Sequence, residues 1–296
     1  GTHHARFAQI SWRALDLRVM RIDSHQHFWR YDPDQYGWID NDMAVLKHNH
    51  LPKNLAIAQE SLGFVGSIAV QARQSLEETR WLLGLADNHE CIKGVVGWVD
   101  LCSKNASEHL LEFSEHPRFS GVRHVVQDEP DDNFLLRSDF LMGIGELSNL
   151  NLTYDILVYP RQLPAALRFI PMFPDQSFVL DHIAKPNIKT GKLEPWATQI
   201  FELASFSNVH CKISGMVTEA EWGYWKPEDF NPYLDVVLSA FGPERLMIGS
   251  DWPVCLLSGE YTPVMKLAID FMETHAPEHL DAFLGGNALA FYGSKA

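Results

Sequence analysis

Short apolar runs rich in β-branched residues alternate along the chain with segments whose hydrophobic positions follow a helical period. Runs of this length and composition are typical of strands that are buried on both faces of a parallel sheet. The predicted strands are residues 19–27, 65–71, 94–100, 121–126, 152–158, 178–183, 209–213 and 246–250.

Helix signals occupy the segments between the predicted strands. Ser75 and Glu78 have the spacing of a capping box before a helix that ends near residue 89. Thr262 is predicted to cap another helix, with Pro263 in its first turn and an apolar stripe that begins at Val264. The remaining helices are predicted at 104–115, 137–148, 161–172, 192–206, 229–241 and 281–290.

The alternation of eight strands with helices predicts an α/β protein with a parallel sheet, and eight is the number that closes a (β/α)8 TIM barrel. A doubly wound open sheet is the alternative, but no GxGxxG follows the first strand. Because the chain has no linker or internal repeat, we interpret residues 20–296 as one barrel domain. Residues 1–19 are interpreted as an N-terminal extension or a remnant of expression.

Composition and charge narrow the classes of function. The 296 residues are 46% hydrophobic, and the net charge of −14 disfavours binding to nucleic acid or to anionic membrane surfaces. No apolar run approaches the roughly 18 residues of a membrane span, and the N-terminus lacks the pattern of a signal peptide. The scattered cysteines are typical of free thiols in a reducing compartment. We therefore expect a cytoplasmic protein that acts on a small molecule, and the sequence indicates no oligomeric state.

Ionisable residues gather where the predicted strands end. His25 and His27 end the first strand, and because strand side chains alternate, they are predicted to share a face with Asp23. His182 and Asp251 end the sixth and eighth strands, and the active sites of parallel barrels lie at these carboxyl ends. The other polar or aromatic residues at or just after strand ends are Trp29, Gln71, Arg73, Arg123, His124, Asp155, Asp181, Lys185, Lys212, Ser214 and Trp252.

Each of these residues also has a structural interpretation. A single histidine or aspartate at a strand end is commonly a hydrogen-bonded structural residue, and Lys185 and Lys212 are equally consistent with neutralising nearby carboxylates. The coincidence of so many at one end of a barrel favours a metal site or a catalytic site. Histidines away from the strand ends, His48 and His50 among them, are predicted to lie on the surface.

The motifs at strands one, six and eight resemble those of the amidohydrolase superfamily. They read DSHQH at residues 23–27, DH at 181–182 and GSDWP at 249–253. Together with segments such as VVGWVDL and CKISGMVTEA, these motifs are similar to those of the sugar-lactonase branch, which includes L-fuconolactonases and L-rhamnonolactonases. The resemblance covers nearly the whole chain after Met20.

The resemblance implies a (β/α)8 barrel that hydrolyses its substrate with an activated water. It implies that Asp251 accepts a proton from this water. It also implies that His25, His27 and His182 are catalytic residues, which orient the reacting groups or bind a metal ion.

The predicted metal content follows from two departures from the family pattern. Members with two metal ions have a bridging lysine on strand four and a histidine on strand five, where this chain has Arg123-His124 and Asp155. A paired metal centre is therefore not expected. Two alternatives remain for the site: it holds one divalent ion such as Zn²⁺, or it catalyses the reaction without a metal. The residues that would hold one ion are His25, His27, His182 and Asp251.

A sugar lactone is the substrate that the resemblance implies, opened to the sugar acid by attack of water on the lactone carbonyl. Aromatic residues in the loops after strands one and seven, Trp29 and Trp222 among them, suit the C–H faces of a sugar. The residues predicted to bind substrate are Trp29, Gln71, Arg73, Arg123, His124, Asp155, Lys212 and Trp252. The alternatives are a metal-dependent decarboxylase or an amidase of the same superfamily, and a non-catalytic carbohydrate-binding barrel.

Overall fold

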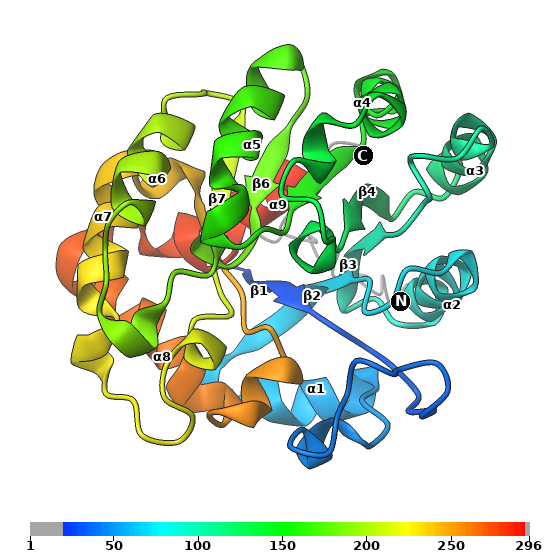
Figure 1. Ribbon diagram of the computed structural model, residues 1–296. Coiled ribbons are helices and arrows are strands. Elements are labelled where there is room, and N and C mark those ends of the chain that lie inside the picture. Colours follow the sequence, from blue (N-terminus) through cyan, green and yellow to red (C-terminus); the bar gives the residue numbers. More distant parts are fainter. Residues whose placement is uncertain (1–19, 294–296) are drawn as a thin grey trace, which may run out of the picture.

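The computed structural model describes residues 20–293 and contains one parallel sheet of eight strands in sequential order (Figure 1). Trp252 forms a parallel bridge with Gln26, so the last strand meets the first. The TIM barrel predicted from the sequence is confirmed. The predicted extension over residues 1–19 lies outside the described residues. The strands are β1 (Arg21–Gln26), β2 (Phe64–Val70), β3 (Ile92–Gly97), β4 (Phe119–His124), β5 (Thr153–Ile156), β6 (Phe178–Leu180), β7 (Val209–Ile213) and β8 (Leu246–Ile248).

The α-helices surround the sheet and cover the outer faces of the strands (Figure 1). No helix within residues 20–293 is long and apolar enough to cross a membrane. The helices are α1 (Pro52–Gln59), α2 (Leu76–Asn88), α3 (Ala106–Ser114), α4 (Ser138–Gly145), α5 (Leu163–Phe169), α6 (Trp196–Ala204), α7 (Asn231–Phe241), α8 (Tyr261–His275) and α9 (Asn287–Tyr292).

Helix beginnings show where the sequence patterns were right and where they were wrong. Ser75 Oγ accepts the hydrogen bond from the Glu78 backbone N–H, so the predicted cap of α2 is confirmed. The predicted start of α8 was wrong, because Glu260 is extended and the helix begins at Tyr261. Helix α1 was not predicted, since its eight residues bury too few apolar side chains to give a clear stripe.

The interior of the barrel is divided into an apolar layer and a polar layer. The apolar layer includes Ile22, Val96 and Met247, and Phe291 and Tyr292 of α9 pack against it. Gly285, just before α9, lies so close to the Met20 carbonyl that a Cβ there would overlap it. Helix α9 therefore closes the end of the barrel at which the strands begin, and the polar layer lies at their carboxyl ends.

Strand β1 contains a bulge that changes which way its side chains point. Asp23 pairs with Ser67 and Gln26 with Ala69, so β1 has one residue more than β2 between these two positions. Ile22 lies in the apolar layer inside the barrel, and the extra residue lets His25 also point inward although it lies an odd number of positions away.

The bulge makes the prediction that Asp23 shares a face with His25 wrong. Asp23 instead points toward helix α8, where Tyr261 donates a hydrogen bond of 3.1 Å to Oδ2. The Ser250 backbone N–H and Oγ–H donate to the same carboxylate at 2.9 and 2.6 Å. Burial raises the pKa of Asp23 to about 6, although these hydrogen bonds lower it. Asp23 therefore anchors the backbone that leads into Asp251.

Candidate active site

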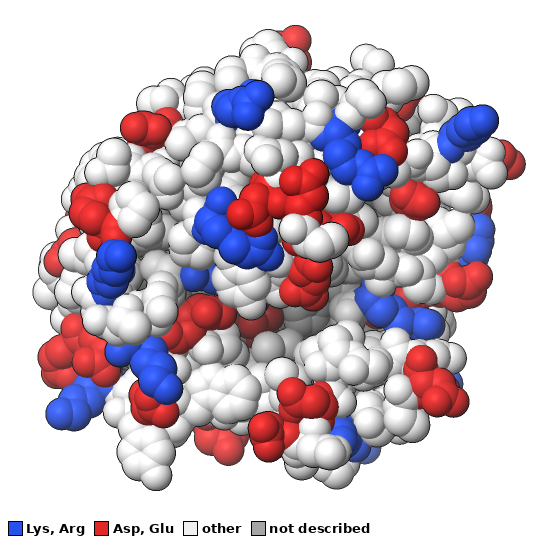
Figure 2. All heavy atoms as spheres, in the orientation of Figure 1, with Lys and Arg blue, Asp and Glu red and all other residues white. Residues whose placement is uncertain are grey.

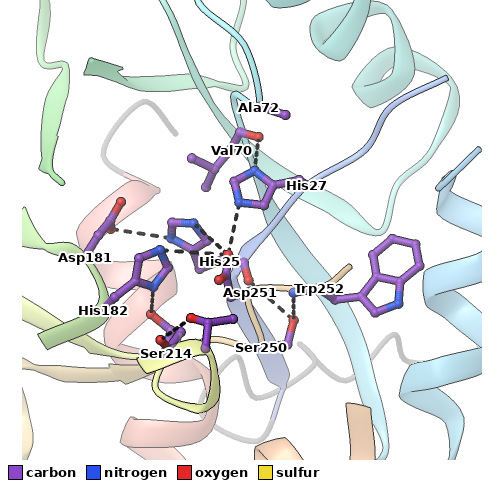
Figure 3. Close-up of polar contacts among 12 residues, drawn as sticks. His25, His27, Val70, Ala72, Asp181, His182, Ser214, Ser250, Asp251 and Trp252 are labelled. Atoms are coloured by element: carbon purple, nitrogen blue, oxygen red, sulfur yellow. Dashed lines mark hydrogen bonds and ion pairs between the residues drawn. The ribbon is translucent and has the colours of Figure 1, made fainter. Parts of the chain in front are cut away.

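Three imidazole rings surround the carboxylate of Asp251 at the carboxyl ends of β1, β6 and β8 (Figure 3). From Asp251 Oδ1, the distance to Nε2 is 3.1 Å for His27 and 3.8 Å for both His25 and His182. All four side chains are buried. The structure thus brings together the four residues that the sequence singled out for chemistry.

The second ring nitrogen of two of these histidines is held by a neighbour. His27 Nδ1 lies 2.9 Å from the carbonyl oxygen of Val70, and His182 Nδ1 lies 2.8 Å from Ser214 Oγ (Figure 3). Because a carbonyl oxygen can only accept, His27 carries a proton on Nδ1, and its Nε2 faces Asp251 Oδ1 at 3.1 Å. Contacts of this kind fix ring orientation in both metal sites and acid–base sites.

The backbone at the site adopts conformations that L residues rarely adopt. Residues 182–185 all have positive φ, between 48° and 60°, and Asp251 has a φ of 56°. Such conformations are costly and cluster where the surrounding structure must hold a functional group in place. Gly215 also has positive φ, at 58°, and a Cβ on it would lie 2.4 Å from His182 Nδ1. The glycine therefore leaves room for the His182 ring.

Gly215→Ala is expected to displace His182 and to lower turnover by up to about 10²-fold, since a shift of about 1 Å at a catalytic group can have this effect. The left-handed backbone alone should cost about 1–2 kcal/mol of stability. Gly63→Ala is the matched control, because Gly63 has a φ of 69° and open space around its Cβ position. Steady-state kinetics and thermal denaturation of both variants measure the two effects. Equal turnover in the two variants would contradict the role given to Gly215.

A layer of buried charges lies directly beneath the histidines. Lys212 Nζ is 2.6 Å from Asp155 Oδ2, 3.2 Å from Asp181 Oδ1 and 3.2 Å from His25 Nδ1. Arg123 Nη1 is 3.1 Å from Asp181 Oδ2 and 3.2 Å from His25 Nε2. The two cations therefore lie beside different ring nitrogens of His25, of which a neutral ring can accept a hydrogen bond at only one, and both carboxylates of the layer are paired.

The buried charges set the protonation of the site. Burial would raise the pKa of Asp251, but the neighbouring His182 and His27 rings outweigh it and lower the pKa below its usual value. Burial lowers the pKa of His25 and of His182 well below the usual range, despite nearby carboxylates. Burial also raises the pKa of Asp155 to about 7, against the attraction of Lys212. At neutral pH the site therefore combines an ionised Asp251 with neutral His25 and His182 rings.

The predicted substrate residues Gln71, Arg123, Asp155 and Lys212 belong to this layer or border it. Arg123 donates to the side-chain oxygen of Gln71 at 2.8 Å and to its carbonyl at 2.7 Å. Both oxygens of Asp155 accept from the hydroxyl of Tyr292, at 2.8 and 2.9 Å. The sequence analysis missed Tyr292, because a residue of the last helix carries no strand-end signal.

The two tryptophans predicted to bind substrate are buried, Trp29 in the core of the loop after β1 and Trp252 in the main hydrophobic core. Trp29 is fully buried and its indole N–H donates to the carbonyl oxygens of Leu46 and His48. Trp252 packs edge-on against His50. The prediction that His50 lies on the surface was wrong, because the segment folds back and His50 exchanges both backbone hydrogen bonds with Trp29.

The two remaining predicted substrate residues, His124 and Arg73, lie at the carboxyl ends of β4 and β2. His124 bonds to Glu129 through Nε2 at 2.6 Å and accepts from the indole N–H of Trp98 at 3.3 Å. The guanidinium of Arg73 lies 5.6 Å from the ring centre of Tyr36. Figure 2 shows a hollow near the centre of this face with acidic side chains around it.

The donor set at the site fits a single divalent metal ion. The sets His25, His27, Asp251 and His25, Asp181, His182 each bring their ligand atoms within 4.8 Å of one another. Imidazole nitrogen with carboxylate oxygen is a donor set that Zn²⁺ uses. A second ion would have to lie where Lys212 and Arg123 already pair with Asp181, so the geometry favours at most one.

Comparison with known proteins agrees with the fold. The amidohydrolase family matches residues 22–294. The chain belongs to this family. It is 40% identical over 287 residues to an L-fucono-1,5-lactonase of Burkholderia multivorans, with 93% of this chain and 97% of the relative covered. An L-fucono-1,5-lactonase of Burkholderia ambifaria is 36% identical, over 93% of this chain and 96% of the relative.

Solved structures of an amidohydrolase from Burkholderia multivorans have the same fold as this family member. Two of them, one with bound HEPES and one with bound zinc, match with a TM-score of 0.88 and 40% sequence identity. They cover 92% of this chain, which itself covers 99% of each of them.

Proposed function

We propose that this amidohydrolase opens sugar lactones by adding an activated water to the lactone carbonyl. The observation that carries the proposal is the convergence of three imidazole Nε2 atoms on Asp251 at the mouth of the barrel. The L-fucono-1,5-lactonase relatives, at 36 and 40% identity, support a sugar lactone as the substrate class.

In this proposal Asp251 is the general base. It accepts a proton as the water oxygen bonds to the carbonyl carbon, and the carbonyl oxygen becomes an oxyanion. Arg123 lies on the side of His25 that faces Asp251 and can stabilise this charge. The ring C–O bond then breaks, and the proton held by Asp251 passes to the ring oxygen. The product is the open-chain hydroxy acid.

The proposal is tested by acid release from a panel of sugar lactones, followed with a pH indicator. The panel contains L-fucono-, L-galactono-, D-arabinono- and L-rhamnono-lactone, and the Asp251→Asn variant serves as the blank. Rapid release by the wild type and release at background by the variant support the proposal. No release from any lactone by folded protein supplied with Zn²⁺ would contradict it.

We further propose that His25, His27, His182 and Asp251 hold one divalent cation. Such an ion would lower the pKa of its bound water toward about 7, which offsets the weak basicity of an Asp251 with a lowered pKa. His27 and His182, whose Nδ1 atoms are already occupied, present Nε2 as ligands.

Equilibrium dialysis against Zn²⁺ followed by metal analysis is expected to give one ion per chain. The double variant His27→Ala/His182→Ala is expected to bind none, because it loses two of the nitrogen ligands. Two ions per chain in the wild type would be incompatible with the positions of Lys212 and Arg123. Unchanged binding in the double variant would place the ion elsewhere.

A further inference from the structure

A cleft of about 600 Å³ lies over the carboxyl ends of β5, β6 and β7, beside the histidine cluster. Tyr159 lines it from the loop after β5, Lys185 from the turn after β6, and Glu219 and Trp222 from the loop after β7. Trp222, which the sequence analysis named among the aromatic residues suited to a sugar, lines this cleft, whereas the strand-end residues predicted to bind substrate do not.

Lys185 is tied to the catalytic cluster by the left-handed turn that carries His182. The turn is closed by a hydrogen bond of 2.8 Å from the Lys185 backbone N–H to the His182 carbonyl. The backbone of Lys185 is therefore fixed relative to the backbone of His182. The ammonium group of Lys185 also lowers the pKa of His182 and of Asp251, so a ligand that contacts Lys185 lies near the histidine cluster.

Lys185 and Glu219 line the cleft as a long ion pair that is not hydrogen-bonded. Lys185 Nζ lies 3.9 Å from Glu219 Oε1 and 5.3 Å from the ring centre of Tyr159. The side chains are only 13% and 19% exposed. Within residues 20–293, Lys185 Nζ has no acceptor at hydrogen-bond distance, so its donors are available to a ligand. Burial also raises the pKa of Glu219.

A second pair at the same cleft provides a contrast. Lys189 Nζ lies 2.7 Å from Glu221 Oε2, and these side chains are 59% and 53% exposed. This outer pair is satisfied internally and by water. The inner pair, Lys185 and Glu219, is partly buried and incompletely paired, which is unfavourable unless another polar partner completes it.

We propose that Lys185 and Glu219 bind neighbouring hydroxyl groups of the lactone ring and select polyhydroxylated lactones. An ammonium donor beside a carboxylate acceptor matches adjacent hydroxyls, each of which both donates and accepts. Tyr159 and Trp222 offer ring faces for the C–H side of the sugar. This assignment rests on the proposed lactonase function.

The test compares two lactones of the same ring size, L-fucono-1,5-lactone and unsubstituted δ-valerolactone. Glu219→Gln and Lys185→Gln are each expected to lower kcat/KM for the sugar lactone by about 10- to 10²-fold, mainly through KM, as for loss of a hydrogen bond to a charged group. For δ-valerolactone, kcat/KM should stay within about twofold of the wild type, since no hydroxyl contacts are lost. Calorimetric binding of L-fuconate should weaken by a similar factor, a reading independent of turnover.

Asp270→Asn is the control, because Asp270 lies in an exposed pair with Lys266 on α8. This variant should keep the wild-type kcat/KM for both lactones. If kcat/KM of the Lys185 and Glu219 variants falls equally for both lactones, the assignment is overturned and the two residues have a structural or catalytic role instead. Unchanged kinetics on both, with wild-type lactonase activity present, would overturn this assignment alone. A wild type that opens no lactone would overturn the proposed function and this assignment together.

Discussion

Asp251→Asn is expected to lower kcat for lactone opening by about 10³- to 10⁴-fold while the protein stays folded. The amide has nearly the same shape but cannot accept a proton from water. The backbone contacts of the segment do not depend on the carboxylate, since the Asp251 N–H donates to the His25 carbonyl and Ser250 is held by Asp23. The loss should therefore appear in turnover and not in stability.

The measurement is steady-state acid release at saturating lactone, with thermal denaturation of the same samples. Asp270→Asn makes the same chemical change on an exposed helix and should keep the wild-type rate. If Asp251→Asn retains more than about a tenth of kcat, another group must accept the proton and the proposed mechanism is wrong.

The strands and the histidine–aspartate cluster were predictable because their signals are local. Each buried strand is a short apolar run, and in a parallel barrel every strand ends on the same side. His27, His182 and Asp251 lie at such ends, so the sequence places them on one side of the barrel. The structure then brings Nε2 of His27 and of His182 within 3.8 Å of Asp251 Oδ1.

The details that the sequence could not give depend on long-range packing. The bulge that turns Asp23 outward is set by pairing with β2, and a period of two along the strand cannot reveal an inserted residue. Whether a loop tryptophan contacts substrate or fills a core depends on how its loop folds back, as Trp29 and His50 show. From the sequence, Lys185 was equally consistent with a lysine that neutralises a nearby carboxylate. Only its position in the left-handed turn and at the cleft indicates a role in ligand binding.

The layer of charges beneath the histidines explains how the barrel tolerates so many ionisable groups. Asp155, Asp181 and Lys212 are completely buried, and Arg123 is nearly so. Each of them has at least one partner of opposite charge within 3.2 Å. The layer therefore supports His25 from below, and Asp155, Asp181 and Lys212 contribute to the site without having to touch the substrate.

Lys212→Met is expected to destabilise the protein by about 3–5 kcal/mol, because it leaves Asp155 and Asp181 buried without their shared cation. Lys266→Met is the matched control. It removes the lysine of an exposed pair on α8 and should cost less than about 1 kcal/mol. Denaturant unfolding of both variants gives the free energies of unfolding.

Adding Asp155→Asn to Lys212→Met separates an electrostatic cause from simple loss of packing. The second change removes one of the stranded carboxylates, so the double variant should recover part of the lost stability, while a packing defect would not be repaired. Two results would show that pairing between Lys212 and the two carboxylates does not stabilise the layer. One is a loss of unfolding free energy in Lys212→Met close to that in Lys266→Met, and the other is a double variant less stable than Lys212→Met. Recovery would establish Lys212 as the cation that allows two carboxylates to lie beneath the histidine cluster.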